Sequence, residues 1–264
     1  MTNYKELLED KITTRKEVKL ESVSIDNQSY FKITNNDEMR PFFMSIVSES
    51  NHWMFISSNG GLTAGRKNSE FALFPYYSDD KITESSEITG AKSIFQVKRN
   101  GKRHIWEPFS IRFEGEYNVN RNLYKSVYGN AIIFEEENID LGVTYRYQWS
   151  SSNFYGFVRS SKLTNTGDGS VEISLLDGIQ NILPFGVSSD LQNASSNLVD
   201  AYKRSELIEE TGLGIFALSA IIVDKAEPSE ALKANVVWSL GLENKKYLLS
   251  SLQLNEFRKF GEII

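Results

Sequence analysis

The sequence predicts an all-β fold in which two large antiparallel sheets pack as a sandwich, with one or two short helices against them. From Ile139 to Trp149 every second residue is apolar, which is the pattern of a strand with one buried face. Short apolar segments recur along the chain and are separated by Asn-Gly and other glycine-containing turn signals. Strands that alternate with tight turns are typical of antiparallel sheets.

Three turns are expected to join neighbouring strands as hairpins. Asn100-Gly101 is the strongest of these signals, because Asn and Gly adopt the positive φ angles of a two-residue turn at little cost. Residues 165–169 (Asn-Thr-Gly-Asp-Gly) and residues 212–214 (Gly-Leu-Gly) predict the other two.

Two further strands are predicted from shorter alternating patterns, over residues 109–113 and 171–175. The side chains expected to face the core are Val143, Tyr145, Tyr147, Phe109, Ile111, Phe113, Val171, Ile173 and Leu175. Trp149 and Trp238 are assigned to the core as well, because each continues an alternating strand face. The acidic run 135–137 is expected to be a solvated surface.

Helical spacing of apolar residues is confined to three places. Residues 4–12 share one helical face, and residues 191–202 share another behind Asp190, which is available as an N-cap. At the end of the chain, residues 257–264 show the same spacing behind Asn255 as a cap. The middle segment is expected to be a helix laid over the sheets.

The composition indicates a single globular domain over residues 1–264. Hydrophobic residues make up 40% of the chain and charged residues 24%, which is enough apolar material for a core. The chain has no cysteine, so disulfides are excluded. A net charge of −6 argues against nucleic acid as a partner.

Neither a secretory signal nor a membrane span is predicted. The first ten residues lack a basic segment followed by an apolar one, so the expected location is cytoplasmic. The longest apolar run, residues 214–223, is about half of the roughly 20 residues that cross a bilayer.

A series of landmarks then points to a family. In chain order they are Pro41-Phe42-Phe43, Ile56-Ser57-Ser58-Asn59-Gly60-Gly61, Phe74-Pro75-Tyr76-Tyr77, Ile105-Trp106-Glu107-Pro108 and Lys162-Leu163-Thr164-Asn165-Thr166. This order resembles the N-terminal domain of the cellobiose phosphorylase-like, glycosyltransferase family 36-type carbohydrate-active enzymes, over roughly residues 30 to 185. That family includes inverting disaccharide phosphorylases.

The resemblance implies a galactose mutarotase-like super-sandwich. In that family the sandwich precedes an α-helical barrel that carries the catalytic acid, and this chain has neither the length nor the helical content for such a barrel. The resemblance therefore implies an accessory N-terminal domain, the first part of a longer protein, that binds carbohydrate and shapes the substrate entrance or a dimer contact. The expected partners are a sugar or oligosaccharide, the helical barrel and a second copy of the chain.

The residues expected to contact substrate are polar turn residues and aromatic residues in the matching segments. They are Asn59, Gly60, Gly61, Arg66, Tyr76, Tyr77, Trp106 and Glu107. Aromatic faces suit the C–H face of a sugar ring, and polar side chains bind its hydroxyl groups. The turn at 59–61 and the segment at Trp106 are expected to line one concave surface, although Asn-Gly-Gly is also an ordinary hairpin turn and Trp106 also fits a core position.

No catalytic residue, metal site or cofactor is predicted. The only two histidines, His52 and His104, lack metal-ligand spacing. An alternative remains open, in which the chain is a self-sufficient sugar epimerase-like enzyme with His52 or His104 as its acid, or a stand-alone carbohydrate-binding module.

Overall fold

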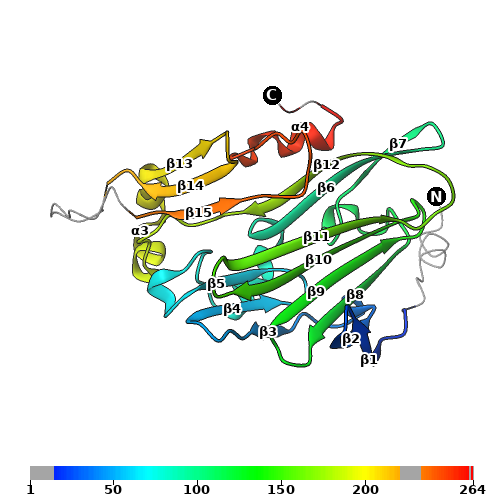
Figure 1. Ribbon diagram of the computed structural model, residues 1–264, viewed down its shortest axis with the longest axis horizontal. Coiled ribbons are helices and arrows are strands. Elements are labelled where there is room, and N and C mark those ends of the chain that lie inside the picture. The colour runs from blue at the N-terminus through cyan, green and yellow to red at the C-terminus, as the bar shows by residue number, and fades with distance from the viewer. Residues whose placement is uncertain (1–14, 221–232, 262, 264) are drawn as a thin grey trace, which may run out of the picture.

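Antiparallel β-sheets dominate the structure, which confirms the all-β prediction (Figure 1). The computed structural model describes residues 15–220, 233–261 and 263. The helix predicted over residues 4–12 therefore lies outside the described residues.

The largest sheet has six strands, in the order β1-β2-β8-β9-β10-β11. These strands are β1 (Lys19–Ile25), β2 (Gln28–Thr34), β8 (Val119–Ser126), β9 (Ala131–Asn138), β10 (Val143–Ser152) and β11 (Gly156–Asn165). Each neighbouring pair is antiparallel.

The second large sheet that the sequence predicted is not formed, and three smaller sheets of three strands each accompany the six-stranded sheet. The first is β12 (Glu172–Gln180), β6 (Gly90–Arg99) and β7 (Lys102–Trp106); the second is β13 (Lys203–Ile208), β14 (Leu213–Leu218) and β15 (Asn235–Trp238); the third is β3 (Phe43–Ile46), β4 (His52–Ser57) and β5 (Leu62–Arg66). In Figure 1 the first two form the upper layer, and the third lies with the six-stranded sheet in the lower layer.

Short helices connect or cover these sheets. They are η1 (Asn36–Glu38), η2 (Ser69–Phe71), α2 (Asp79–Glu84), η3 (Ser85–Glu87), η4 (Ile111–Phe113), α3 (Ser189–Tyr202), η6 (Ser251–Gln253) and α4 (Leu254–Arg258). Helix α3 lies at the end of the molecule next to β13 and β14, and α4 lies over β6 and β12 (Figure 1). The buried side chain of Phe257 anchors α4 against Ile94 and Ile105 of the sheet below it.

The main core lies between the two layers and includes the inward face of β10. Val143, Tyr145, Tyr147 and Trp149 are buried, whereas the residues between them are partly exposed. Ile173 and Leu175 of β12 pack against the same core. The period-two pattern therefore identified the faces of both strands correctly.

The strand predicted over residues 109–113 is wrong. Phe109 has a φ of 63°, which interrupts an extended chain, and residues 111–113 form the 3-10 helix η4. The Ser110 side chain accepts a hydrogen bond from the Arg112 backbone N–H and so caps this turn. As a result Ile111 is 68% exposed instead of facing the core, whereas Phe109 still packs against it.

Two of the three predicted hairpins are confirmed. Asn100 and Gly101 have φ angles of 51° and 77° and join β6 to β7, and Gly212 ends the turn between β13 and β14. The turn at 165–169 does not form a hairpin, because β12 pairs with β6 and not with β11. This turn instead carries the chain from one layer to the other.

The helix caps also differ from the sequence-based predictions. Helix α3 is capped by Ser188, whose side chain accepts a hydrogen bond from the Leu191 backbone N–H, and Asp190 lies in the first turn. In α4, Asn255 is the second helical residue and not the cap. In both cases a residue within the first turn was mistaken for the cap.

Candidate functional site

The Asn59-Gly60-Gly61 segment forms the hairpin turn between β4 and β5. Gly60 has a φ of 94°, and its N–H donates to the carbonyl oxygen of Ser57 at 2.8 Å. Gly61 is required by close approach, because a Cβ atom there would lie 2.1 Å from the carbonyl oxygen of Ile82 in α2. The Asn59 amide binds the carbonyl oxygen of Thr83 in the same helix at 2.9 Å.

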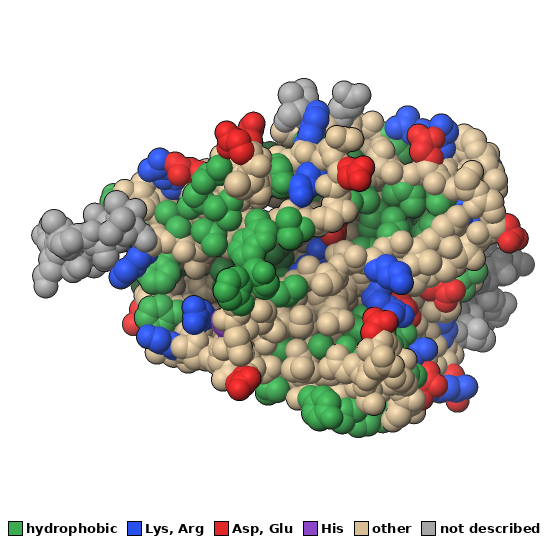
Figure 2. Space-filling view, in the orientation of Figure 1, with side chains coloured by type: hydrophobic (Ala, Val, Ile, Leu, Met, Phe, Trp, Pro, Cys, Tyr) green, Lys and Arg blue, Asp and Glu red, His purple; other side chains and the backbone are tan. Residues whose placement is uncertain are grey.

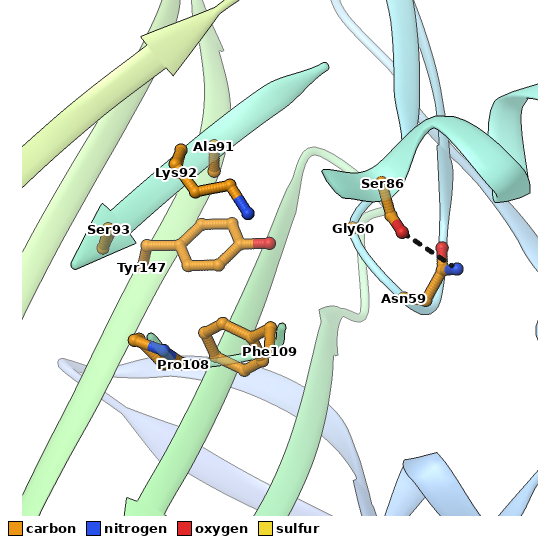
Figure 3. Close-up of a pocket in the computed structure, with 9 residues that line it drawn as sticks. All are labelled: Asn59, Gly60, Ser86, Ala91, Lys92, Ser93, Pro108, Phe109 and Tyr147. Carbon is orange, nitrogen blue, oxygen red and sulfur yellow. Dashed lines mark hydrogen bonds between the residues drawn. The ribbon is translucent and has the colours of Figure 1, made fainter. Parts of the chain in front are cut away.

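This turn forms one wall of a small polar pocket between the layers (Figure 3). The lining residues are Asn59, Gly60, Ser86, Ala91, Lys92, Ser93, Pro108, Phe109 and Tyr147. The hydroxyl end of Tyr147 points from β10 toward the turn. The cavity volume is about 20 Å³, which accommodates about one water-sized group and not a sugar ring.

The pocket brings the turn together with the segment that follows Trp106, but Trp106 itself is only 1% exposed. Its indole Nε1–H donates to Glu136 Oε1 at 2.7 Å, and its ring packs against Phe95. The same carboxylate accepts from the Phe109 backbone N–H at 2.6 Å and from Arg121 Nε at 2.7 Å. Trp106 is therefore a core residue without a face for stacking.

The acidic run 135–137 is not a solvated surface as predicted, because two of its members are buried and paired. Glu136 faces the core side, where Trp106, Phe109 and Arg121 bind it. Glu135 faces the opposite side of the sheet, where it accepts hydrogen bonds from Asn122, Tyr124 and Arg146. The cations that pair with these acids come from other strands, so the run alone gave no signal of them.

A buried ion network lies beside the pocket. Lys92 Nζ is 2.9 Å from both Glu87 Oε2 and Glu107 Oε1, and Arg258 of α4 binds Glu107 Oε2 at 2.7 Å. Burial alone would raise the pKa of Glu107, but the hydrogen bonds from Arg258 and the charge of Lys92 hold this pKa below its usual value of 4.5. Glu107 is thus an ionised structural group that is not open to a ligand.

The other residues expected to contact substrate lie away from this pocket. Arg66 is at the far end of β5 from the turn and donates to Asn51 Oδ1. Tyr76 and Tyr77 are exposed, and Tyr76 packs edge-on against Trp53 with ring centres 5.8 Å apart. Of the residues expected to contact substrate, only Asn59 and Gly60 line the pocket; Gly61 belongs to the same turn, and Glu107 binds Lys92 of the lining.

A second polar cluster, which the sequence analysis missed, joins the edge strands β11 and β12. Arg159 binds Asp177 through two contacts, Nη1 to Oδ2 at 3.0 Å and Nη2 to Oδ1 at 2.8 Å. The Tyr145 hydroxyl donates to Asp177 Oδ1 at 2.8 Å, and burial raises the pKa of Tyr145 to about 12. An aspartate within the apolar segment 173–179 is the signal that could have revealed this cluster.

Aromatic side chains are exposed at the tip of the β10–β11 hairpin. Tyr155 is 59% exposed and lies 6.0 Å from Trp238 of β15, and Phe154 packs on Tyr155 at 4.9 Å. Trp238, which was predicted to be in the core, is 40% exposed, because Val237 and not Trp238 faces the core from β15. Figure 2 shows a hollow between β11 and β15 with hydrophobic side chains along its margin.

Within residues 15–220, 233–261 and 263, no group of three or more His, Cys, Asp or Glu side chains is arranged to hold a metal ion. Over the same residues, no helix combines the length and the apolar character needed to cross a bilayer.

Comparisons with known proteins do not assign this chain to a family. No family model matches the sequence, and no curated protein matches it either. The function must therefore be inferred from the geometry.

We predict that Trp106→Ala lowers the free energy of unfolding by roughly 3–5 kcal/mol, because it empties a core position and leaves Glu136 without one of its donors. Trp238→Ala, the matched control at the surface, should change stability by less than about 1 kcal/mol. Urea unfolding followed by circular dichroism measures both. Equal losses for the two variants would contradict the placement of Trp106.

The lowered pKa of Glu107 also predicts a pH dependence. Its contribution to stability is fully present above pH 4.5, the ordinary pKa, and is lost as the pH falls through the lower folded-state pKa. Glu107→Gln should cost about 3 kcal/mol at pH 7 and flatten the loss of stability below pH 4.5. Glu84→Gln, at an exposed position of α2, should keep the wild-type slope in urea unfolding from pH 7 to pH 3.

Proposed function

We propose that this chain is an accessory β-sandwich domain of a carbohydrate-active enzyme and that it binds a sugar or oligosaccharide in the hollow between β11 and β15. In this role it helps to shape the substrate entrance or a dimer contact. The chemistry is performed by a helical barrel domain, as in the enzymes that carry a galactose mutarotase-like sandwich. The resemblance of residues 30 to 185 to disaccharide phosphorylases supports the choice of ligand.

The observation that carries this proposal is the pair of exposed aromatic side chains, Tyr155 and Trp238, beside the hollow. Exposed apolar side chains that lie next to one another mark binding sites, whereas single exposed ones do not. Their flat faces suit the C–H face of a pyranose, and the Tyr155 hydroxyl and the Trp238 indole N–H can bind the hydroxyl groups at its edge. These two residues come from different sheets, so the fold itself assembles the pair.

The carboxylates near the pocket support an accessory role in preference to catalysis. A glycosidase acid needs a raised pKa so that it is protonated at neutral pH. Glu87 and Glu107 instead have lowered pKa values, because Lys92 and the hydrogen-bond donors around them outweigh the effect of burial. Such ionised, fully paired groups stabilise the fold and have no proton to give to a leaving group.

The test is sugar binding by aromatic variants. Tyr155→Ala should weaken cellobiose binding about tenfold, or roughly 1.4 kcal/mol, with an unchanged melting temperature. Tyr128→Ala is the matched control, since Tyr128 is 78% exposed at the β8–β9 turn, and it should bind as the wild type does. Isothermal titration calorimetry measures both.

Three results would contradict the proposal. One is wild-type protein that fails to bind cellobiose, and another is an equal effect of the Tyr155 and Tyr128 variants. The third is turnover of cellobiose by this chain on its own, which would place the active site within it and favour a self-sufficient enzyme.

A further inference from the structure

The small pocket beside the Asn59-Gly60-Gly61 turn brings an ammonium group and two hydroxyl groups to one cavity. In Figure 3 the Lys92 ammonium and the Tyr147 hydroxyl both point toward the turn, and Ser86 lies on the other side of the cavity. A Cβ atom on Gly60 would lie 3.0 Å from the Tyr147 hydroxyl oxygen, so the glycine leaves room above the turn. The three polar groups come from β6, β10 and η3, and the fold alone brings them together.

Each of these groups has a proton that no described residue accepts. The Tyr147 hydroxyl makes no hydrogen bond with any described residue, and burial raises its pKa, so it keeps its proton. An ammonium group has three N–H donors, and Lys92 directs two of them to carboxylates. The Ser86 oxygen accepts a hydrogen bond from the Asn59 amide at 3.5 Å, which leaves the Ser86 proton to donate. Because buried donors are satisfied in the great majority of cases, three donors at one cavity point to an acceptor that binds there.

The charges around the cavity favour an anion as that acceptor. Among the described residues that line it, Lys92 is the only charged one. Lys92 belongs to a network in which three cations surround two carboxylates, because Arg258 pairs with Glu107 and Arg112 lies 3.9 Å from Glu87. The network therefore carries one net positive charge. The Lys92 side chain is only 8% exposed, so salt in the surrounding solvent screens its charge poorly.

We infer that this pocket binds a single monatomic anion, chloride or another halide, through Lys92, Tyr147 and Ser86. The cavity volume of about 20 Å³ admits one small ion, whereas a phosphate, a sulfate or a sugar ring is too large. The ion accepts hydrogen bonds from the three donors and offsets the surplus positive charge. Because its donors come from β6, β10 and η3, the bound ion stabilises the packing of these elements against one another. This site does not depend on the proposed sugar binding in the hollow between β11 and β15.

The experiment compares thermal unfolding in sodium chloride and in sodium gluconate at equal ionic strength. Gluconate carries the same charge but is too large for the cavity. Chloride at about tenfold above its Kd should raise the melting temperature by about 3 °C relative to gluconate. Tyr147→Phe removes one donor without breaking a hydrogen bond among the described residues, so it should weaken chloride binding about tenfold and reduce this shift to about 1 °C. Tyr128→Phe, at a position that is 78% exposed, is the matched control and should keep the full shift.

A second measurement on the wild type covers the case in which Tyr147→Phe does not fold. Crystals soaked in sodium bromide should show an anomalous-scattering peak between the Lys92 ammonium and the Tyr147 hydroxyl. Absence of that peak, with a water molecule in its place, overturns the inference. Equal melting temperatures of the wild type in chloride and gluconate, or an undiminished chloride shift in Tyr147→Phe, overturn it as well. None of these measurements uses a sugar, so their failure leaves the proposed carbohydrate binding to its own test.

Discussion

The salt bridge between Arg159 and Asp177 joins the two layers of this sandwich at their edge strands. It links β11, the last strand of the six-stranded sheet, to β12, the edge strand of the facing sheet. Two charges inside a sandwich are costly unless they are closely paired and hydrogen-bonded, so the strands that carry them are held at a fixed separation. Tyr145 and Ser93 complete the hydrogen bonds from the core side. Arg159 Nε itself is buried and has no hydrogen-bond partner among the described residues.

Paired charges also explain why the predicted pocket at the Asn59-Gly60-Gly61 turn is small. Glu136 holds Trp106, the Phe109 backbone and Arg121 together, which draws the segment after β7 into the space beside the turn. Lys92 occupies the adjoining volume and is fixed by Glu87 and Glu107. The turn residues are thus explained by close packing against α2, and ligand binding need not be invoked for them.

Much of the fold could be predicted because local patterns carry it. The alternation through β10 identified its buried face, and Asn100-Gly101 identified its hairpin, since both signals depend on neighbouring residues alone. Residues 109–113 were misassigned because three alternating apolar residues also fit a 3-10 turn once Phe109 adopts a positive φ.

The candidate site was harder to predict, because its parts come from distant strands. Val237 and Trp238 are adjacent, so their side chains point to opposite faces of β15. Which of the two faces the core depends on which sheet covers β15, and the local sequence does not determine this. Arg159 and Asp177 are 18 residues apart and meet only because β12 pairs with β6. The one sequence signal for this cluster is the presence of an aspartate in an otherwise apolar strand.

The most direct test of sugar binding in the hollow uses the indole N–H resonances of the four tryptophans in a ¹H–¹⁵N spectrum. Cellobiose is titrated into the intact chain, and Trp-to-Phe variants assign the peaks. The account predicts that the Trp238 resonance shifts along a saturation curve, while Trp106, whose N–H is held by Glu136, stays in place. A stationary Trp238 resonance, or a shift confined to Trp106, would contradict it.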